Sequence, residues 1–198
     1  MRIRIIMCIT ALLLLTGCGK GNDADIYKKQ VINLVDSNIE EEFDYVSSEI
    51  VNSKEEHYKY HFNSSERELK IEVESYLHNG ERLFVTNYLE AIEEYYSAQI
   101  LAYLRDNLEH FDEASQTITV YSWEELDKVI ECLCYCENLY AQENQYQEPY
   151  FTLENPIMNI SLVNGSGTVV AAHSVAGYFT QEEIAYNLYT VFEAEGVE

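Results

Sequence analysis

Apolar and polar residues alternate one by one most clearly between positions 57 and 74. Residues 57–62 and 69–74 each place an apolar side chain at every second position, with a polar segment at 63–67 between them. Such alternation is typical of half-buried strands and predicts an antiparallel hairpin, which a strand at 43–51 precedes. The predicted buried face of this hairpin consists of Tyr58, Tyr60, Phe62, Leu69, Ile71 and Val73.

Elsewhere the apolar residues follow steps of three and four, which predict helices. The first helix is expected over residues 24–39, and its apolar side consists of Ile26, Val31, Leu34 and Val35. After Asn79-Gly80 the period becomes helical, which predicts the longest helix from about Val85 to near His110. Its apolar stripe is expected to lie across the sheet.

Two later helices are predicted from the residues that begin them. Segments 122–125 and 180–183 read Ser-Trp-Glu-Glu and Thr-Gln-Glu-Glu. Both fit a capping box, in which the Ser or Thr oxygen accepts from a free backbone N–H and the third-position Glu accepts from the cap's own N–H. Hydrophobic residues flank both boxes in staple positions: Tyr121 with Leu126, and Phe179 with Ile184.

Strand-like runs precede both of these helices, at 117–121 and 168–172, and a second hairpin is expected from 157–163 and 168–172. Hairpins mixed with helices predict an α+β fold, with helices packed on a largely antiparallel sheet. A strictly alternating βαβ arrangement fits this order less well. No segment resembles a linker between domains, so a single domain is expected over residues 24–198.

The N-terminus has the three parts of an export signal. Arg2 and Arg4 precede an apolar run of 11 residues, Ile5 to Leu15. A helix that spans a bilayer needs roughly 20 residues, so this run fits a secretory leader better than a membrane span. Small residues and a cysteine follow directly, in Leu15-Thr16-Gly17-Cys18.

This tetrapeptide resembles the lipobox of bacterial lipoproteins. The resemblance covers only the leader. It implies that residues 1–17 are a signal peptide removed by cleavage before Cys18, and that Cys18 carries acyl chains such as palmitate. Two acyl chains suffice for stable anchoring. Residues 18–23 would then be the lipidated cysteine and a short tether, and the membrane would be a partner through the lipid.

Two other interpretations of the N-terminus remain open. The apolar run can form a buried N-terminal helix with an incidental cysteine. Alternatively, the chain can be a secreted protein cut near Gly17, which would share the compartment but have no anchor.

Acidic residues dominate the chain behind the leader. Without residues 1–17 it has 10 Lys and Arg against 35 Asp and Glu, a formal charge of about −25. Nucleic-acid binding rests on clustered Lys and Arg, so this balance disfavours nucleic acid as a partner. The acidity suits cations, basic proteins or simple solubility. Seventeen tyrosines accompany one tryptophan, and tyrosine serves both recognition surfaces and cores.

The segment Cys132-Leu133-Cys134-Tyr135-Cys136 is the most tempting metal motif. On a helix, however, Cys134 points about 160° away from the midpoint of the other two cysteines, so three thiolates cannot converge on one ion. We expect Cys136 in the core, Cys132 at its rim and Cys134 toward solvent, with no disulfide within the chain.

The remaining candidates for metal binding are weaker still. His57 and His61 would lie about 13 Å apart on one strand, and His78, His110 and His173 are scattered. The acidic segment 40–44 lacks the spacing of a calcium loop and is expected to be a solvated helix end. We therefore predict no metal site and no cofactor.

No catalytic residue can be assigned from the sequence. Gly165-Ser166-Gly167 lacks the five-residue pattern of a nucleophile elbow and fits a hairpin turn.

The expected function is that of a non-enzymatic lipoprotein on the outer side of the cell membrane, which binds an envelope protein or another envelope component. One alternative is a hydrolase acting on wall or extracellular substrate through two convergent acids with different environments. A third is capture of cations by the acidic surface. Oligomeric state and envelope type do not follow from the sequence.

Overall fold

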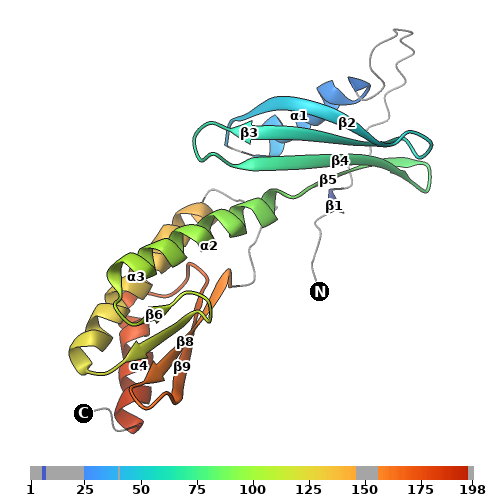
Figure 1. Ribbon diagram of the computed structural model, residues 1–198. Coiled ribbons are helices and arrows are strands. Elements are labelled where there is room, and N and C mark those ends of the chain that lie inside the picture. Colours follow the sequence, from blue (N-terminus) through green and yellow to red (C-terminus); the bar gives the residue numbers. More distant parts are fainter. Residues whose placement is uncertain (1–5, 8–24, 40, 146–155, 196–198) are drawn as a thin grey trace. The chain divides into compact units, whose positions relative to one another are not determined.

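The computed structural model describes residues 6–7, 25–39, 41–145 and 156–195 (Figure 1). The chain forms two compact units, unit 1 (residues 1–92) and unit 2 (residues 93–198). The boundary between them falls inside helix α2 (Tyr88–Asn107). The predicted α+β class is confirmed, because helices pack against two sheets in which only one of the described strand pairs is parallel.

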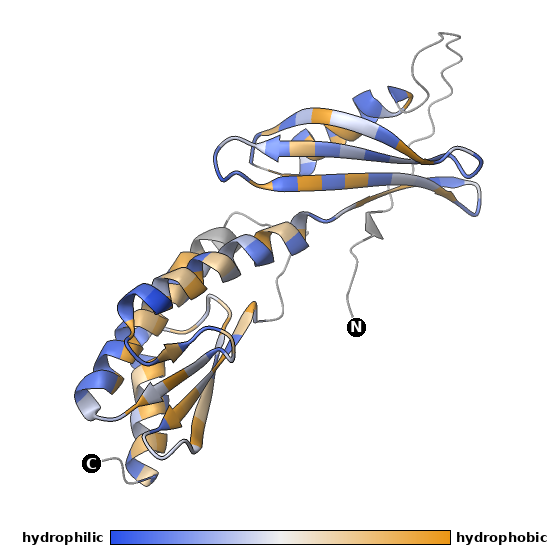
Figure 2. Ribbon diagram, viewed as in Figure 1, coloured by the Kyte–Doolittle hydropathy of each residue, from blue (hydrophilic) through white to orange (hydrophobic). Residues whose placement is uncertain are grey.

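Unit 1 is built on an antiparallel meander. Its four main strands are β2 (Phe43–Asn52), β3 (His57–Ser64), β4 (Lys70–His78) and β5 (Glu81–Thr86). They lie in the order β5-β4-β3-β2. Tyr60 is opposite Val73 and Phe62 is opposite Ile71, and all six predicted core residues of the hairpin are buried. The alternation of apolar and polar residues along these strands is visible in Figure 2.

Helix α1 (Lys28–Asn38) contributes Val31, Leu34 and Val35 to this core, as predicted. The prediction was wrong for Ile26, which is 61% exposed. Ile26 precedes the first helical turn, so the helical periodicity that would direct its side chain inward does not yet apply.

The segment after Asn79-Gly80 differs from its prediction, because it forms strand β5 before the helix begins. Asn79 and Gly80 have φ values of 52° and 83°. A two-residue hairpin turn that matches the twist of its strands requires positive φ at both of these positions. Helix α2 therefore starts at Tyr88 instead of Val85, and it ends at Asn107. The Thr86 hydroxyl accepts a hydrogen bond from the backbone N–H of Tyr88 at 3.1 Å.

A two-residue strand, β1 (Ile6–Met7), pairs antiparallel with β5. It lies inside the predicted leader, so cleavage before Cys18 would remove it and leave β5 as an edge of the sheet. The lipobox, Cys18 and the tether are outside the described residues.

Unit 2 combines the rest of α2 with a second sheet and two further helices. Its elements are β6 (Phe111–Asp112), β7 (Thr117–Val120), α3 (Trp123–Gln145), β8 (Met158–Asn164), β9 (Val169–Val175) and α4 (Gln181–Ala194). The strands lie in the order β6-β7-β8-β9, and the β8–β9 hairpin is confirmed. Strand β6 and the parallel pairing of β7 with β8 were not predicted.

The core of unit 2 lies between one face of this sheet and the three helices. Leu104 of α2, Leu133 of α3 and Leu188 of α4 are buried in one cluster with Ile118 and Ile160 of the sheet. The opposite face of the sheet carries small and polar side chains, among them Thr117, Thr119, Asn159, Ser161 and Ser174. One-sided burial of this kind is typical of sheets with helices on a single face.

Helix α3 begins with only half of its predicted capping box. The backbone N–H of Glu125 donates to the Ser122 hydroxyl at 3.2 Å, as expected. The Glu125 carboxylate accepts from the backbone N–H of Tyr121 instead of that of Ser122. Tyr121 is itself exposed, with its ring 4.8 Å from that of His110.

Across the described ranges, no helix combines the length and the apolar character needed to cross a membrane.

Candidate interaction surface

Helix α4 starts at a complete capping box, which confirms the prediction. The Thr180 hydroxyl accepts from the backbone N–H of Glu183 at 3.3 Å, and the Glu183 carboxylate accepts from the backbone N–H of Thr180 at 2.9 Å. Hydrogen bonds from the Thr180 backbone and hydroxyl lower the pKa of Glu183. The box fixes where α4 begins and therefore which of its residues face outward.

The two faces of α4 differ sharply. Its inner face buries Ile184, Leu188 and Phe192. Steps of three and four along its outer face give Glu182, Tyr186, Tyr189 and Glu193, which are all exposed. Tyr186 is 74% exposed, the highest value among the large apolar residues that the structure describes.

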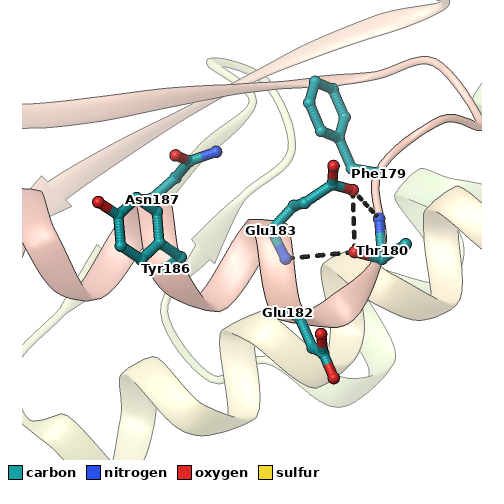
Figure 3. Close-up of a pocket in the computed structure, with 6 residues that line it drawn as sticks. All are labelled: Phe179, Thr180, Glu182, Glu183, Tyr186 and Asn187. Atoms are coloured by element: carbon teal, nitrogen blue, oxygen red, sulfur yellow. Dashed lines mark hydrogen bonds between the residues drawn. The ribbon is translucent and has the colours of Figure 1, made fainter.

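A shallow hollow of about 520 Å³ opens at the start of α4 (Figure 3). It is lined by Phe179, Thr180, Glu182, Glu183, Tyr186 and Asn187. None of these six described residues is basic, and two are acidic. The hollow therefore combines aromatic rings with negative charge.

The aromatic residues continue past the hollow onto helix α3. The ring of Tyr189 lies 6.2 Å from the ring of Trp123, and the Tyr189 hydroxyl donates to the carboxylate of Asp127. This hydrogen bond raises the pKa of Tyr189. We refer to Trp123, Phe179, Tyr186 and Tyr189 together as the α4 aromatic surface.

A buried carboxylate binds the segment that leads into the α4 aromatic surface. Glu137 of α3 is 1% exposed, and its Oε1 lies 2.8 Å from Nε2 of His173 in strand β9. The same carboxylate accepts from the backbone N–H of Ala176 at 3.3 Å and of Tyr178 at 3.0 Å. A buried carboxylate needs such donors, because an unpaired one would be strongly destabilising.

These bonds hold the segment between β9 and α4 in place. Residues 176–179 run directly into the Thr180 cap, and the His173 ring lies 5.5 Å from the ring of Phe179. The clamp formed by Glu137 and His173 therefore positions one aromatic residue of the surface and the start of the helix that carries two others.

Sequence reasoning missed this clamp, although two signals were present. Glu137 follows Cys136 and precedes Tyr140 in the buried stripe of α3, which is an unusual place for an acid. His173 lies two residues before the buried Val175, so strand alternation directs both side chains inward.

The three cysteines of α3 are free thiols. Cys136 is in the core as predicted and Cys134 is partly exposed, but Cys132 is buried instead of lying at the rim. The hydroxyl of Tyr103 in α2 donates a hydrogen bond to the Cys132 sulfur. Burial raises the pKa of the Cys132 thiol, and it raises that of Cys136 to about 12.

His57 and His61 share one face of β3, where carboxylates of the neighbouring strands pair with them. Nε2 of His57 is 3.1 Å from Glu74, and Nδ1 of His61 is 3.3 Å from Glu72. Between them, Nζ of Lys59 lies 2.8 Å from Glu72. Nowhere in the described residues do three or more His, Cys, Asp or Glu side chains form a group fit to hold a metal ion.

The expectation that residues 40–44 are a solvated helix end is wrong for Glu41. The Glu41 side chain is 2% exposed, and its Oε2 lies 3.2 Å from Nε of Arg67. The hydroxyl of Ser64 donates to its other oxygen. Arg67 belongs to the turn after β3. Because β2 and β3 are antiparallel, this turn lies next to the start of β2, where Glu41 is located. Glu40 is outside the described residues.

The hollow does not meet the requirement of the hydrolase alternative, which is two convergent acids in different environments. Glu182 and Glu183 are successive helix residues, so their side chains leave the axis about 100° apart. Glu183 is also engaged in the helix cap. The hollow therefore does not place an acid and a base where both could face one substrate.

The sequence matches no model of a protein family and no curated protein, and the structure matches no solved structure.

Proposed function

We propose that this chain is a lipoprotein anchored on the outer side of the cell membrane through Cys18, and that it acts as a non-enzymatic binding protein of the bacterial envelope. In this proposal the α4 aromatic surface contacts an envelope protein. The anchor rests on the order of charge, apolar run, small residues and cysteine in residues 2–18.

The observation that carries the binding role is the α4 aromatic surface itself. Interface centres are enriched in Tyr and Trp, and truncating such residues removes much of the binding energy. Tyr186 extends into solvent, while the buried clamp fixes the helix and segment that carry its neighbours. Rigid support of exposed aromatic residues lowers the entropy lost when they bind.

The anchor is tested by cell fractionation of the full chain carrying Cys18→Ala. We expect this variant to leave the membrane fraction or to accumulate unprocessed, while the unaltered chain stays with the membranes. Cys8→Ala is the matched control, because Cys8 lies in the same leader but outside the lipobox. Equal membrane retention and processing of all three chains would contradict the anchor.

The binding role is tested by a photo-crosslinking amino acid placed at Tyr186 or at Tyr135 in intact envelopes. Both positions are exposed tyrosines of unit 2, but Tyr135 stacks on Tyr103, outside the α4 aromatic surface. A discrete protein adduct from position 186 that position 135 does not give is the expected result. Identical adducts from both positions, or none from either, would contradict a role for this surface.

A further inference from the structure

Unit 2 contains almost no cations of its own. Between residues 93 and 198 the sequence has 19 Asp and Glu but only two basic residues, Arg105 and Lys128. Arg105 is paired with Asp106 and Glu113. Lys128 lies one helical turn before Cys132, and neither basic residue lines the hollow.

In unit 1, basic side chains make cation–π contacts with tyrosine rings. Nζ of Lys28 lies 3.9 Å from the ring centroid of Tyr45, and the guanidinium of Arg82 lies 4.1 Å from that of Tyr27. A cation over an aromatic face is attracted by the negative charge density of the ring. In unit 2, Tyr186 and Tyr189 present rings of the same kind.

We propose that the α4 aromatic surface binds a lysine- or arginine-rich segment of its partner protein. The cations of this segment lie over Tyr186 and Tyr189, and the carboxylate of Glu182, one helical turn from Tyr186, balances their charge. This inference rests on the proposed binding function and names the chemistry of the partner.

The charge of the surface disfavours the other occupants. A phosphate or an anionic lipid would meet Glu182 and Glu183, and the cap of Thr180 and Glu183 already occupies backbone N–H groups at the start of α4. A second copy of unit 2 would bring the same excess of acids against its own. A neutral sugar can stack on tyrosine and donate hydroxyl hydrogen bonds to the carboxylates, but it carries no positive charge to balance them, so it serves as a comparison ligand.

The test uses the whole processed chain with its lipid, held in a neutral detergent. Calorimetry measures its affinity for a 12-residue peptide of alternating lysine and alanine, for the same peptide with glutamate in place of lysine, and for a neutral chitin oligosaccharide. Trp123 is the only tryptophan of the chain and lies beside Tyr189, so its fluorescence reports whether binding occurs at this surface.

We expect the lysine peptide to bind at least about tenfold more tightly than either other ligand and to change the Trp123 fluorescence. Replacing both tyrosines, by Tyr186→Ala with Tyr189→Ala, should weaken lysine-peptide binding by about 5- to 30-fold, the range that cation–π contacts support. Tyr135→Ala is the matched control and should leave the affinity unchanged, because it removes an exposed ring elsewhere in the same unit. Glu182→Gln keeps the shape of the surface and should weaken binding by about two- to fivefold.

Three results would overturn the proposal. The first is equal affinity of the lysine peptide for the double variant and the Tyr135→Ala chain, because acidity alone would then explain binding. The second is tighter binding of the oligosaccharide or the glutamate peptide. The third is no binding of any ligand by a chain whose circular dichroism shows it to be folded. None of these results bears on Cys18, so a failed cation site and a failed membrane anchor remain distinguishable.

Discussion

The two units of this chain divide charge and exposed aromatic residues unequally. From Cys18 to residue 92, unit 1 has 8 basic and 16 acidic residues, whereas unit 2 has 2 and 19. Among the residues that the structure describes, the exposed large apolar residues of unit 1 are aliphatic: Ile26, Val46, Ile50, Val51 and Leu77. Those described in unit 2 are aromatic apart from Val169: Tyr121, Tyr135, Tyr178, Phe179, Tyr186 and Tyr189.

The two units differ in how much of their charge is balanced internally. In unit 1, Lys59, Arg67 and Arg82 each pair with a carboxylate of the same unit. In unit 2 the acids far outnumber the available cations, so most of the charge remains unmatched within the unit. Exposed aromatic residues beside unmatched charge are suited to a partner that supplies both apolar contact and positive charge. We therefore propose that unit 2 carries the recognition role.

The largest effect is expected from removing the buried acid of each unit. Glu137→Ala removes the buried carboxylate that the His173 ring and two backbone N–H groups contact, and Glu41→Ala removes the buried carboxylate that pairs with Arg67 and Ser64. Each change should destabilise its own unit by about 2–5 kcal/mol. Hydrogen exchange of the full chain measures the two units separately.

Binding separates the two variants further. Glu137→Ala should also weaken lysine-peptide binding, because the clamp positions Phe179 and the start of α4, while Glu41→Ala should leave the affinity unchanged. An equal loss of affinity in both variants would mean that the units do not divide their roles in this way.

As the pH rises, unit 2 should begin to lose stability at a lower pH than unit 1. Burial raises the pKa of Cys136 from an ordinary 9.0 to about 12, so the folded thiol keeps a proton that the unfolded chain loses. The stabilisation is therefore complete below pH 9 and is lost as pH rises toward 12. Burial likewise raises the pKa of Tyr60 in unit 1, where the loss begins only above the ordinary value of 10.0.

Pulse proteolysis at stepped pH, with the fragments identified by mass, measures which unit opens first. We expect cleavage in unit 2 at lower pH than in unit 1. Cys136→Ala should reduce this difference, because it removes one of the two buried thiols of unit 2 whose pKa values are raised. Cleavage in unit 1 at a lower pH than in unit 2 would contradict this expected order.

Salt should also distinguish the units, with an effect of about 1 kcal/mol or less. Raising sodium chloride from about 20 mM to about 300 mM shortens the Debye length several-fold and screens repulsion among the unmatched acids. Unit 2 should therefore become more stable by hydrogen exchange, while unit 1, whose acids are balanced in part by eight basic residues, should change less. Equal stabilisation of both units would show that the pairing in unit 1 has no energetic consequence.

The smallest effect is expected for the exposed ion pairs of unit 1. The hydrogen bond with Glu72 raises the pKa of Lys59, yet the pair is partly solvated. Lys59→Met should lower the stability of unit 1 by about 0.2–1 kcal/mol, as is usual for such pairs. Thermal unfolding with and without salt measures the loss, and unit 2 should be unaffected.

Local patterns in the sequence predicted much of the fold. The β3–β4 hairpin, its six core residues, the β8–β9 hairpin and the cap of α4 each depend on neighbours within a few residues, and all were confirmed. Strand β5 was missed because its apolar residues fit both periods, although Asn79-Gly80 carried the hairpin signal. The parallel pairing of β7 with β8 joins strands on either side of α3, which no local pattern encodes.

The boundary between the two units is not marked by a linker in the sequence. Their boundary falls inside α2, where residues on both sides follow the same helical period, so no linker rich in glycine, proline or serine marks it. The candidate surface was predicted only in part. The cap of α4 follows from Thr180 and Glu183, but the clamp joins Glu137 to His173 across 36 positions, and its role depends on tertiary packing.

The most direct test of the whole account is the mass of the N-terminal peptide of the chain purified from membranes. We predict a peptide that begins at Cys18 and carries the added mass of a diacylglyceryl group, as the proposed anchor on the outer side of the membrane requires. Two results would contradict the account. One is a peptide that begins at Met1, and the other is a peptide that begins elsewhere and carries no lipid on Cys18.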